Sequence, residues 1–162
     1  CEVGSRVQVR VGGNFCYAPD PLSDTTDILL IAGGVGINPL FSIVLHLMYL
    51  EQKYPDFRVK VILLYSARTV SELLFKEEIV KISKSNPNFK IQFFLTGKCQ
   101  SCDIPEAKSH RIAEADLNAA LKLMKPNCSV YLCGPPPMIN QMDELLVGLG
   151  VGQSRIQYEK WW

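Results

Sequence analysis

The feature that most constrains the fold is an apolar run followed at once by a glycine-rich turn, at residues 28–39. The run Ile-Leu-Leu-Ile at 28–31 has no polar side chain on either face, which is typical of a central parallel strand covered by helices on both sides. The next residues, Ala-Gly-Gly-Val-Gly-Ile-Asn-Pro, allow a sharp turn into a helix. We expect Asn38 to cap that helix and Pro39 to be its first residue. A helix that begins there directs its positive end toward any bound anion.

A second apolar strand, Ser-Val-Tyr-Leu at 129–132, ends in a comparable way. It is followed by Cys-Gly-Pro-Pro-Pro-Met at 133–138, which opens another helix. Ligands of open α/β sheets bind outside the carboxyl ends of the strands, so the two loops predict one shared crevice. The spacing departs from the common Rossmann fingerprint, because Pro39 stands where a third glycine is expected. One such loop is also compatible with a simple strand-to-helix turn, whereas the pair favours a dinucleotide site.

Together these two motifs resemble the nicotinamide-binding domain of the ferredoxin–NADP reductase superfamily. Leu-Tyr-Ser-Ala-Arg at 64–68, followed by Glu-Leu-Leu-Phe-Lys-Glu-Glu at 72–78, is similar to the second strand and helix of that family. The resemblance extends over residues 27–162. It implies an α/β fold with a Rossmann-like five-stranded parallel sheet, order 3-2-1-4-5, and helices on both faces.

The resemblance also implies a function. The domain is expected to bind NAD and to present its nicotinamide to a flavin, FAD, on an upstream domain, so that hydride passes from nicotinamide C4 to flavin N5. Cys133 is expected beside the nicotinamide, where it positions the ring. The full set of expected cofactor-binding residues is Gly33, Gly34, Val35, Gly36, Ile37, Asn38, Pro39, Ser66, Arg68, Cys133, Gly134, Pro135 and Pro136. The chain contains no Arg-x-Tyr-Ser/Thr flavin motif, so we expect it to bind no FAD and to be inactive by itself.

Some of these residues have simpler interpretations. Cys133 is also compatible with an ordinary buried cysteine, and Arg68 with a solvated surface arginine. The choice between NAD and NADP stays open: no acidic residue follows the second strand directly, and Lys98 offers a cation to a 2′-phosphate. The Ser-Arg pair that is typical of NADP-binding relatives is missing, and we favour NAD. The electron acceptor is not identified by the sequence.

Two other function classes remain open. The domain is compatible with a non-catalytic dinucleotide-binding or sensor module, because fold alone does not establish activity. Cys99 and Cys102 form a C-x-x-C pair that suits thiol redox chemistry or a metal, although zinc needs two further ligands and His110 is the only nearby candidate. We interpret the pair as coincidental loop cysteines and expect no metal. His46 is expected to lie in the core or on a helix face, and Trp161 and Trp162 either shield a flavin or pack on the sheet.

The chain is expected to divide into a short N-terminal segment and one domain. Valines alternate with polar residues over 3–11, which predicts a half-buried strand. By the resemblance, residues 1–20 are the last strand of the upstream flavin-binding barrel with the start of a linker. The domain is expected to contain strands at 28–32, 59–65, 90–96, 129–133 and 154–158, helices at 39–53, 70–84, 113–124 and 138–148, and an irregular loop at 98–111.

Composition excludes several classes of partner. With a net charge of +1 over 162 residues, the chain has no basic surplus that would attract nucleic acid or an anionic membrane. The longest apolar stretch, 39–50, is interrupted by Ser42 and His46 and is expected to be a buried helix that is too short to span a bilayer. Six cysteines without disulfide-scaffold density favour a reducing intracellular setting, mitochondrial or cytosolic. Because the chain begins at Cys1, we expect an excised fragment, with any targeting sequence upstream.

Overall fold

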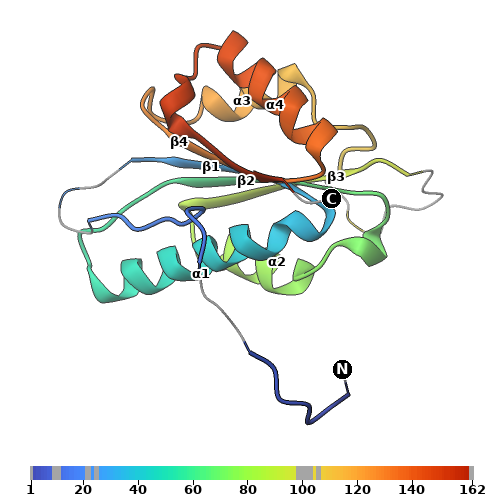
Figure 1. The fold of residues 1–162 in the computed structure, drawn as a ribbon. Helices are drawn as coiled ribbons and strands as arrows, with labels where there is room; N and C mark the ends of the chain where they lie inside the picture. The colour runs from blue at the N-terminus through green and yellow to red at the C-terminus, as the bar shows by residue number, and fades with distance from the viewer. Residues whose placement is uncertain are drawn as a thin grey trace.

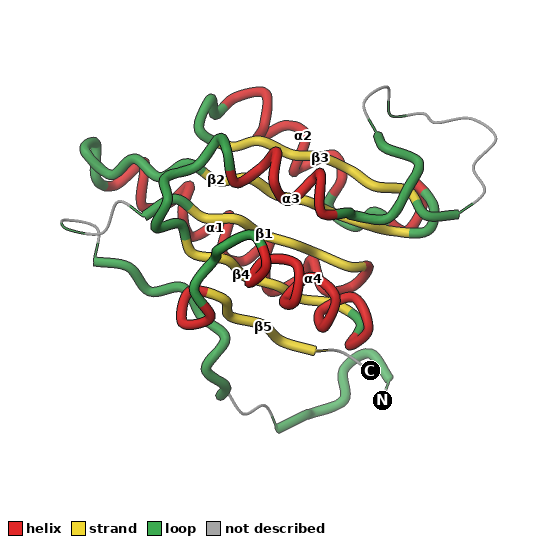
Figure 2. Tube along the Cα trace, turned by 90° about the horizontal axis from the view of Figure 1, so that it is seen from above, coloured by secondary structure: helices red, strands yellow, loops and turns green. Residues whose placement is uncertain are grey.

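The computed structural model contains a single parallel sheet of five strands in the order β3-β2-β1-β4-β5 (Figure 2). It describes residues 2–8, 12–20, 23, 26–97, 104 and 107–160. The strands are β1 (Ile28–Gly33), β2 (Val61–Ala67), β3 (Phe89–Leu95), β4 (Ser129–Gly134) and β5 (Ile156–Lys160). The helices are α1 (Ile37–Lys53), α2 (Lys76–Ser85), α3 (Glu114–Leu121) and α4 (Pro136–Gly148). The predicted fold class and strand order are confirmed.

The first strand lies at the centre of the sheet, as its uninterrupted apolar sequence predicts. All six residues of β1 are buried. Leu30 pairs with Leu63 of β2 on one side and with Tyr131 of β4 on the other. Strand order therefore reverses at β1, and the boundary between β1 and β4 is the switch point at which open α/β sheets bind ligands.

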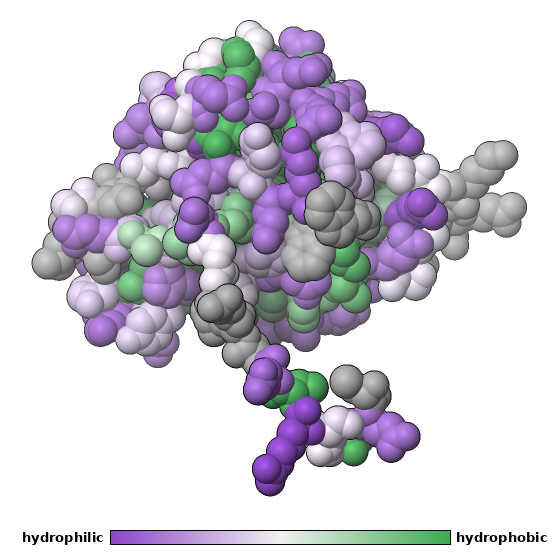
Figure 3. Space-filling view, in the orientation of Figure 1, coloured by the Kyte–Doolittle hydropathy of each residue, from purple (hydrophilic) through white to green (hydrophobic). Residues whose placement is uncertain are grey.

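Helices cover both faces of the sheet (Figure 1). Helices α1 and α2 pack on one face, over a core that includes Leu30, Val44 and Ile79, and α3 and α4 pack on the other, over Ile31, Leu117 and Leu146. Hydrophilic side chains cover most of the outer surface seen in Figure 3. Each helix follows a strand in a right-handed crossover, so all four helices begin near the carboxyl ends of the strands.

A buried carboxylate fixes the sheet at the other end, where the strands begin. Asp27, just before β1, is only 3% exposed. Its side chain accepts hydrogen bonds from the backbone N–H of Lys60 (3.3 Å) and Lys125 (2.9 Å), which precede β2 and β4. These bonds tie the three central strands together at their amino ends and leave the carboxyl ends clear of this network.

The second helix begins later than the sequence predicts. The expected helix at 70–84 is a 3-10 turn at Val70–Glu72 followed, after a break, by α2. The break is made by Phe75, whose φ of 56° is left-handed and therefore unfavourable for a residue with a side chain. The Phe75 ring stacks on Phe41 of α1 at 4.6 Å, a contact that a continuous helix pattern does not reveal.

The N-terminal segment contains no strand within residues 2–8, contrary to the alternating pattern there. These residues are exposed and extend away from the domain (Figure 1), so they have no neighbouring strand with which to pair. Farther along, Phe15 and Tyr17 pack edge-on against Tyr131 of β4, at 5.7 and 6.0 Å between ring centroids. The linker therefore lies against the same face as α1. Its interpretation as the end of a flavin-binding barrel stays a prediction.

Helix α1 is longer than the apolar stretch that marks it in the sequence. With the preceding turn it forms a helical segment of 20 residues, Gly34–Lys53, long and apolar enough by length and composition to cross a membrane. The expectation that the segment is too short for a span is therefore wrong. Leu40, Val44 and Leu47 of this helix are buried in the core under the sheet, which is the packing of a core helix. His46 lies on its exposed face, stacked near Tyr49.

Candidate nucleotide-binding site

The predicted site residues come together at the carboxyl edge of the three central strands. Gly33 at the end of β1 pairs with Ser66 of β2, and Ala32 pairs with Cys133 of β4. The glycine loop, the end of the second strand and the Cys-Gly-Pro-Pro motif are therefore neighbours in space. The sequence predicted this arrangement.

Gly36 is where the loop after β1 meets the loop after β4. A Cβ on Gly36 would collide with the backbone carbonyl of Cys133 and lie 2.8 Å from the backbone nitrogen of Gly134. The sequence suggested that this glycine lets the backbone approach a phosphate. In the structure, the absence of a side chain on Gly36 lets the loops after β1 and β4 pack backbone to backbone.

Gly34 has a different role in the same turn. Its φ of 55° is left-handed, and a Cβ at this position would have no atom within 4 Å. The space around this position is therefore open. Asn38 does not cap the helix as expected: α1 begins at Ile37, and the Asn38 side chain donates a hydrogen bond back to the carbonyl of Val35 at 2.7 Å. The 3-10 turn at Gly34–Gly36 starts the helical path early, which moves Asn38 and Pro39 inside the first turn.

The starts of the four helices differ in charge. Helix α2 carries Glu77 and Glu78 in its first turn, and α3 carries Glu114 and Asp116. The first turns of α1 and α4, which flank the switch point, contain no acidic residue. A helix start attracts negative charge. At the start of α2, a hydrogen bond from the backbone N–H of Glu77 and then the neighbouring Lys76 ammonium lower the pKa of the Glu77 carboxyl. Two helix starts at the switch point are thus left without a negative side chain of their own.

Cys133 occupies the end of β4 and is fully buried. It belongs to the core cluster on the α1 side of the sheet, together with Tyr131. Burial of the side chain agrees with a packing role for the thiol. The backbone carbonyl of Cys133 lies beside Gly36 of the glycine loop. Pro135 is the N-cap of α4 and Pro136 its first residue, so the proline run starts the second helix of the crevice.

At the outer part of the edge, the predicted residue Arg68 is supported by contacts of Tyr65 and Glu72 that the sequence did not predict. Arg68 is exposed just beyond β2, and its backbone N–H donates to the carboxylate of Glu72 at 3.3 Å. The Tyr65 hydroxyl accepts from the N–H of Leu74 at 3.0 Å and donates to the carbonyl of Glu72 at 3.3 Å. Burial raises the pKa of Tyr65, so the hydroxyl keeps the proton that it donates. A tyrosine in a mostly aliphatic strand was the available signal.

Several predicted features lie outside the described residues: Lys98, Cys99, Cys102, Trp161 and Trp162. Their roles stay predictions. Two hollows in the described part of the chain lie away from the glycine loop, one of about 530 Å³ along α2 and one of about 190 Å³ between β3 and α3. The glycine loop faces neither of them.

Comparison with known proteins agrees with this geometry. Residues 30–144, most of the chain, match the sequence profile of the oxidoreductase NAD-binding domain. The chain belongs to this family. It is therefore an NAD-binding domain of the reductase type, and the resemblance found in the sequence is confirmed.

Individual relatives extend the match beyond that region. The oxidoreductase NAD-binding domain-containing protein 1 of Danio rerio is 42% identical over 171 residues, which cover 100% of this chain and 62% of the relative. NADH-cytochrome b5 reductase 1 of Scheffersomyces stipitis is 29% identical over 95% of this chain and 51% of its own length. The CS-b5R domains of human Ncb5or, solved in an NAD⁺ form, share the fold with a TM-score of 0.74 at 23% identity, over 91% of this chain and 39% of that one. The chain thus spans between about half and three fifths of the curated relatives' length.

Proposed function

We propose that this domain holds the pyrophosphate of NADH at the β1–α1 turn and presents the nicotinamide to a flavin on another part of the full-length protein. The observation that carries the proposal is the pair of helix starts, α1 and α4, that flank the switch point without an acidic residue in their first turns. A diphosphate at the β1–α1 turn would meet the positive end of α1 and the backbone N–H groups of the loop. The start of α4 adds no N–H donor, because Pro135, Pro136 and Pro137 have none, but it keeps negative side chains away from the site.

The orientation of the dinucleotide follows from what each side of the crevice offers. On the β4 side, Cys133 and Gly134 are buried and carry no charge, so the surroundings offered to the flat nicotinamide ring are uncharged. On the β2 side, Ser66 and the exposed guanidinium of Arg68 suit a ribose and an adenine face. When bound, the nicotinamide supplies the hydride for the flavin. The protein contributes the position of the ring and the electrostatic environment of the diphosphate.

An open crevice is consistent with a site completed by a second domain. The glycine loop lies at an exposed edge, with Val35 more than half exposed. The curated relatives extend well beyond the part that this chain matches. We therefore expect the isolated chain to bind NADH weakly, because the surface that would cover the nicotinamide belongs to the rest of the protein.

The test uses two glycines of matched geometry. Gly34 and Gly150 both have a left-handed φ, and a Cβ on either would have no atom within 4 Å. Gly34→Ala and Gly150→Ala should therefore cost about the same stability, roughly 1 kcal/mol. Only the first places a methyl group at the proposed phosphate site.

Isothermal titration calorimetry with NADH, NADPH and ADP-ribose measures the difference. We expect Gly34→Ala to weaken binding of all three at least tenfold and Gly150→Ala to bind like the parent. If the folded parent binds none of the three ligands, the dinucleotide proposal is wrong. If both variants bind with equal affinity, the phosphate site does not lie at this turn.

A further inference from the structure

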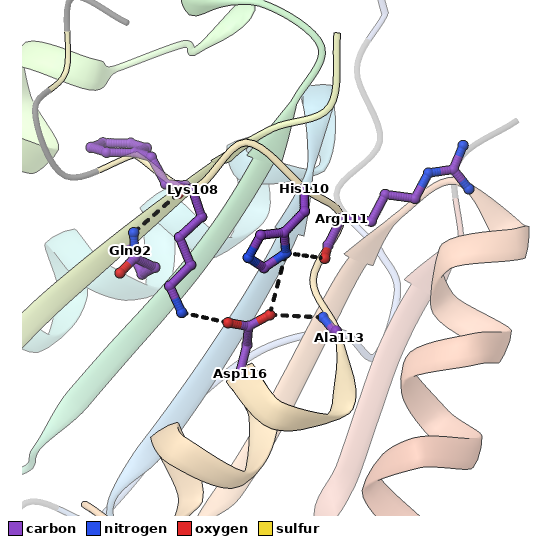
Figure 4. Close-up of polar contacts among 7 residues, drawn as sticks. Gln92, Lys108, His110, Arg111, Ala113 and Asp116 are labelled. Atoms are coloured by element: carbon purple, nitrogen blue, oxygen red, sulfur yellow. Dashed lines mark hydrogen bonds and ion pairs between the residues drawn. The ribbon is translucent and has the colours of Figure 1, made fainter.

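A buried carboxylate gathers the segment Lys108–Asp116 beside strand β3, the edge strand of the sheet (Figure 4). The Asp116 side chain, on the first turn of α3, is 5% exposed and forms an ion pair with the Lys108 ammonium at 2.5 Å. Its second oxygen accepts the N–H of Ala113 at 2.9 Å, and the His110 ring approaches that oxygen at 3.8 Å. The carboxylate is thus fixed from both sides, and the position of Lys108 is fixed with it.

Lys108 is also attached to β3 through its backbone. Its N–H donates to the carbonyl of Phe93 at 3.0 Å, and its carbonyl accepts the N–H of Leu95 at 2.8 Å. The Lys108 ammonium lies 5.5 Å from the centre of the Phe94 ring, and the His110 ring meets the same ring edge-on at 5.6 Å. The segment therefore holds β3 at its last residues, immediately before Thr96.

The end of β3 in turn holds the end of β2. The N–H groups of Thr96 and Gly97 donate to the carbonyls of Ala67 and Arg68 at 2.9 and 2.8 Å. The Glu72 carboxylate accepts a hydrogen bond from the backbone N–H of Arg68. A continuous series of contacts thus connects Asp116 to the backbone of Arg68.

We propose that the Lys108–Asp116 pair is a positioning element for the adenosine half of the dinucleotide. It touches no ligand and acts by fixing the ends of β3 and β2, where Thr96 and Arg68 are exposed. The inference rests on the proposed function, because it assigns the adenosine to the β2–β3 side. It predicts that breaking the pair weakens recognition of adenosine selectively and leaves the β1–β4 side of the crevice unchanged.

The experiment compares three lysine variants by calorimetry with ADP-ribose, in folded protein well below its melting temperature. Lys108→Met removes the charge and keeps much of the stem, whereas Lys108→Arg keeps an ion pair with Asp116. Lys60→Met is the matched control, since the Lys60 ammonium also ties β2 to the α3 region, at the carbonyl of Leu123 (2.7 Å), but at the opposite edge of the sheet. A melting curve for each variant measures its stability separately.

We expect Lys108→Met to raise the Kd of ADP-ribose about fivefold, Lys108→Arg to restore it to within about twofold of the parent, and Lys60→Met to leave it unchanged. In a full-length flavoprotein, Lys108→Met should raise the KM for NADH and leave kcat unchanged. Asp116→Asn, which also removes the ion pair, should reproduce the loss of affinity. If the parent binds ADP-ribose and Lys108→Met binds it equally well, or if Lys60→Met loses as much affinity as Lys108→Met, the inference is wrong. A parent that binds no ADP-ribose contradicts the proposed function itself.

Discussion

The inner and outer halves of the carboxyl edge are held together by different forces. In the inner half, the loops after β1 and β4 meet backbone to backbone at Gly36 and Gly134. In the outer half, Gly97 also lies close to the backbone carbonyl of Arg68, but side chains add much of the support, among them Tyr65, Glu72 and Lys108. The inner half therefore depends on glycine contacts, whereas the outer half depends also on side-chain hydrogen bonds and charge.

This difference predicts two kinds of response to mutation. A close backbone contact either fits or forces the loops apart, so substitution there has a large effect on the whole fold. Hydrogen bonds near the surface contribute about 1 kcal/mol each, so their loss is graded and local. Substitutions in the inner half should therefore lower the stability of the whole fold, whereas substitutions in the outer half should have smaller, local effects.

The largest effect is expected for Gly36→Val. The new side chain would collide with the carbonyl of Cys133, so we expect the free energy of unfolding to fall by about 3 kcal/mol. Urea denaturation measures it. The control is Val35→Ala, an exposed neighbour that should stay within about 0.5 kcal/mol of the parent. A stable Gly36→Val protein would show that the inner loops can separate without cost.

An intermediate effect is expected for Tyr65→Phe. The change leaves the N–H of Leu74 without its acceptor and should cost about 1–2 kcal/mol in urea denaturation. Burial raises the pKa of Tyr65 above 10.0 in the folded state, so the unfolded chain ionises first as pH rises. The contribution of Tyr65 to stability is therefore complete below about pH 10 and declines above it.

The phenylalanine variant should lack that alkaline component. Denaturation curves for both proteins between pH 8 and pH 11 isolate it, because every other titrating group is common to the two. An unchanged difference between parent and variant across this range would contradict the assignment to Tyr65.

The smallest effect is expected for Glu72→Ala, which removes an exposed carboxylate from the N–H of Arg68. We expect a loss of about 0.5 kcal/mol and faster hydrogen exchange at the Arg68 amide. Glu72→Gln keeps an oxygen acceptor and should restore most of the protection. If exchange at Arg68 is equal in all three proteins, the carboxylate does not hold this loop.

The sequence predicted the inner half far better than the outer half. A fully apolar strand followed by a glycine turn is a local pattern, and β1, β4 and their loops follow it closely. The late start of α2 was missed because it depends on Phe75 stacking with Phe41, which lies on another helix. The Asp116 cluster was missed for a different reason: the capping bond of Asp116 to Ala113 follows a local spacing, but the ion pair with Lys108 depends on the path of the loop before α3.

The contact between Gly36 and the Cys133 carbonyl also bears on how such sites are inherited and transplanted. The two loops are far apart in the sequence but share one surface, so neither can be exchanged between relatives without the other. In a chimera that receives only the glycine turn from a homologue, we expect this turn to pack poorly against the original loop after β4. Moving both loops together would transfer an intact unit, and this pairing defines the smallest graft that could carry the proposed diphosphate-binding turn to a new scaffold.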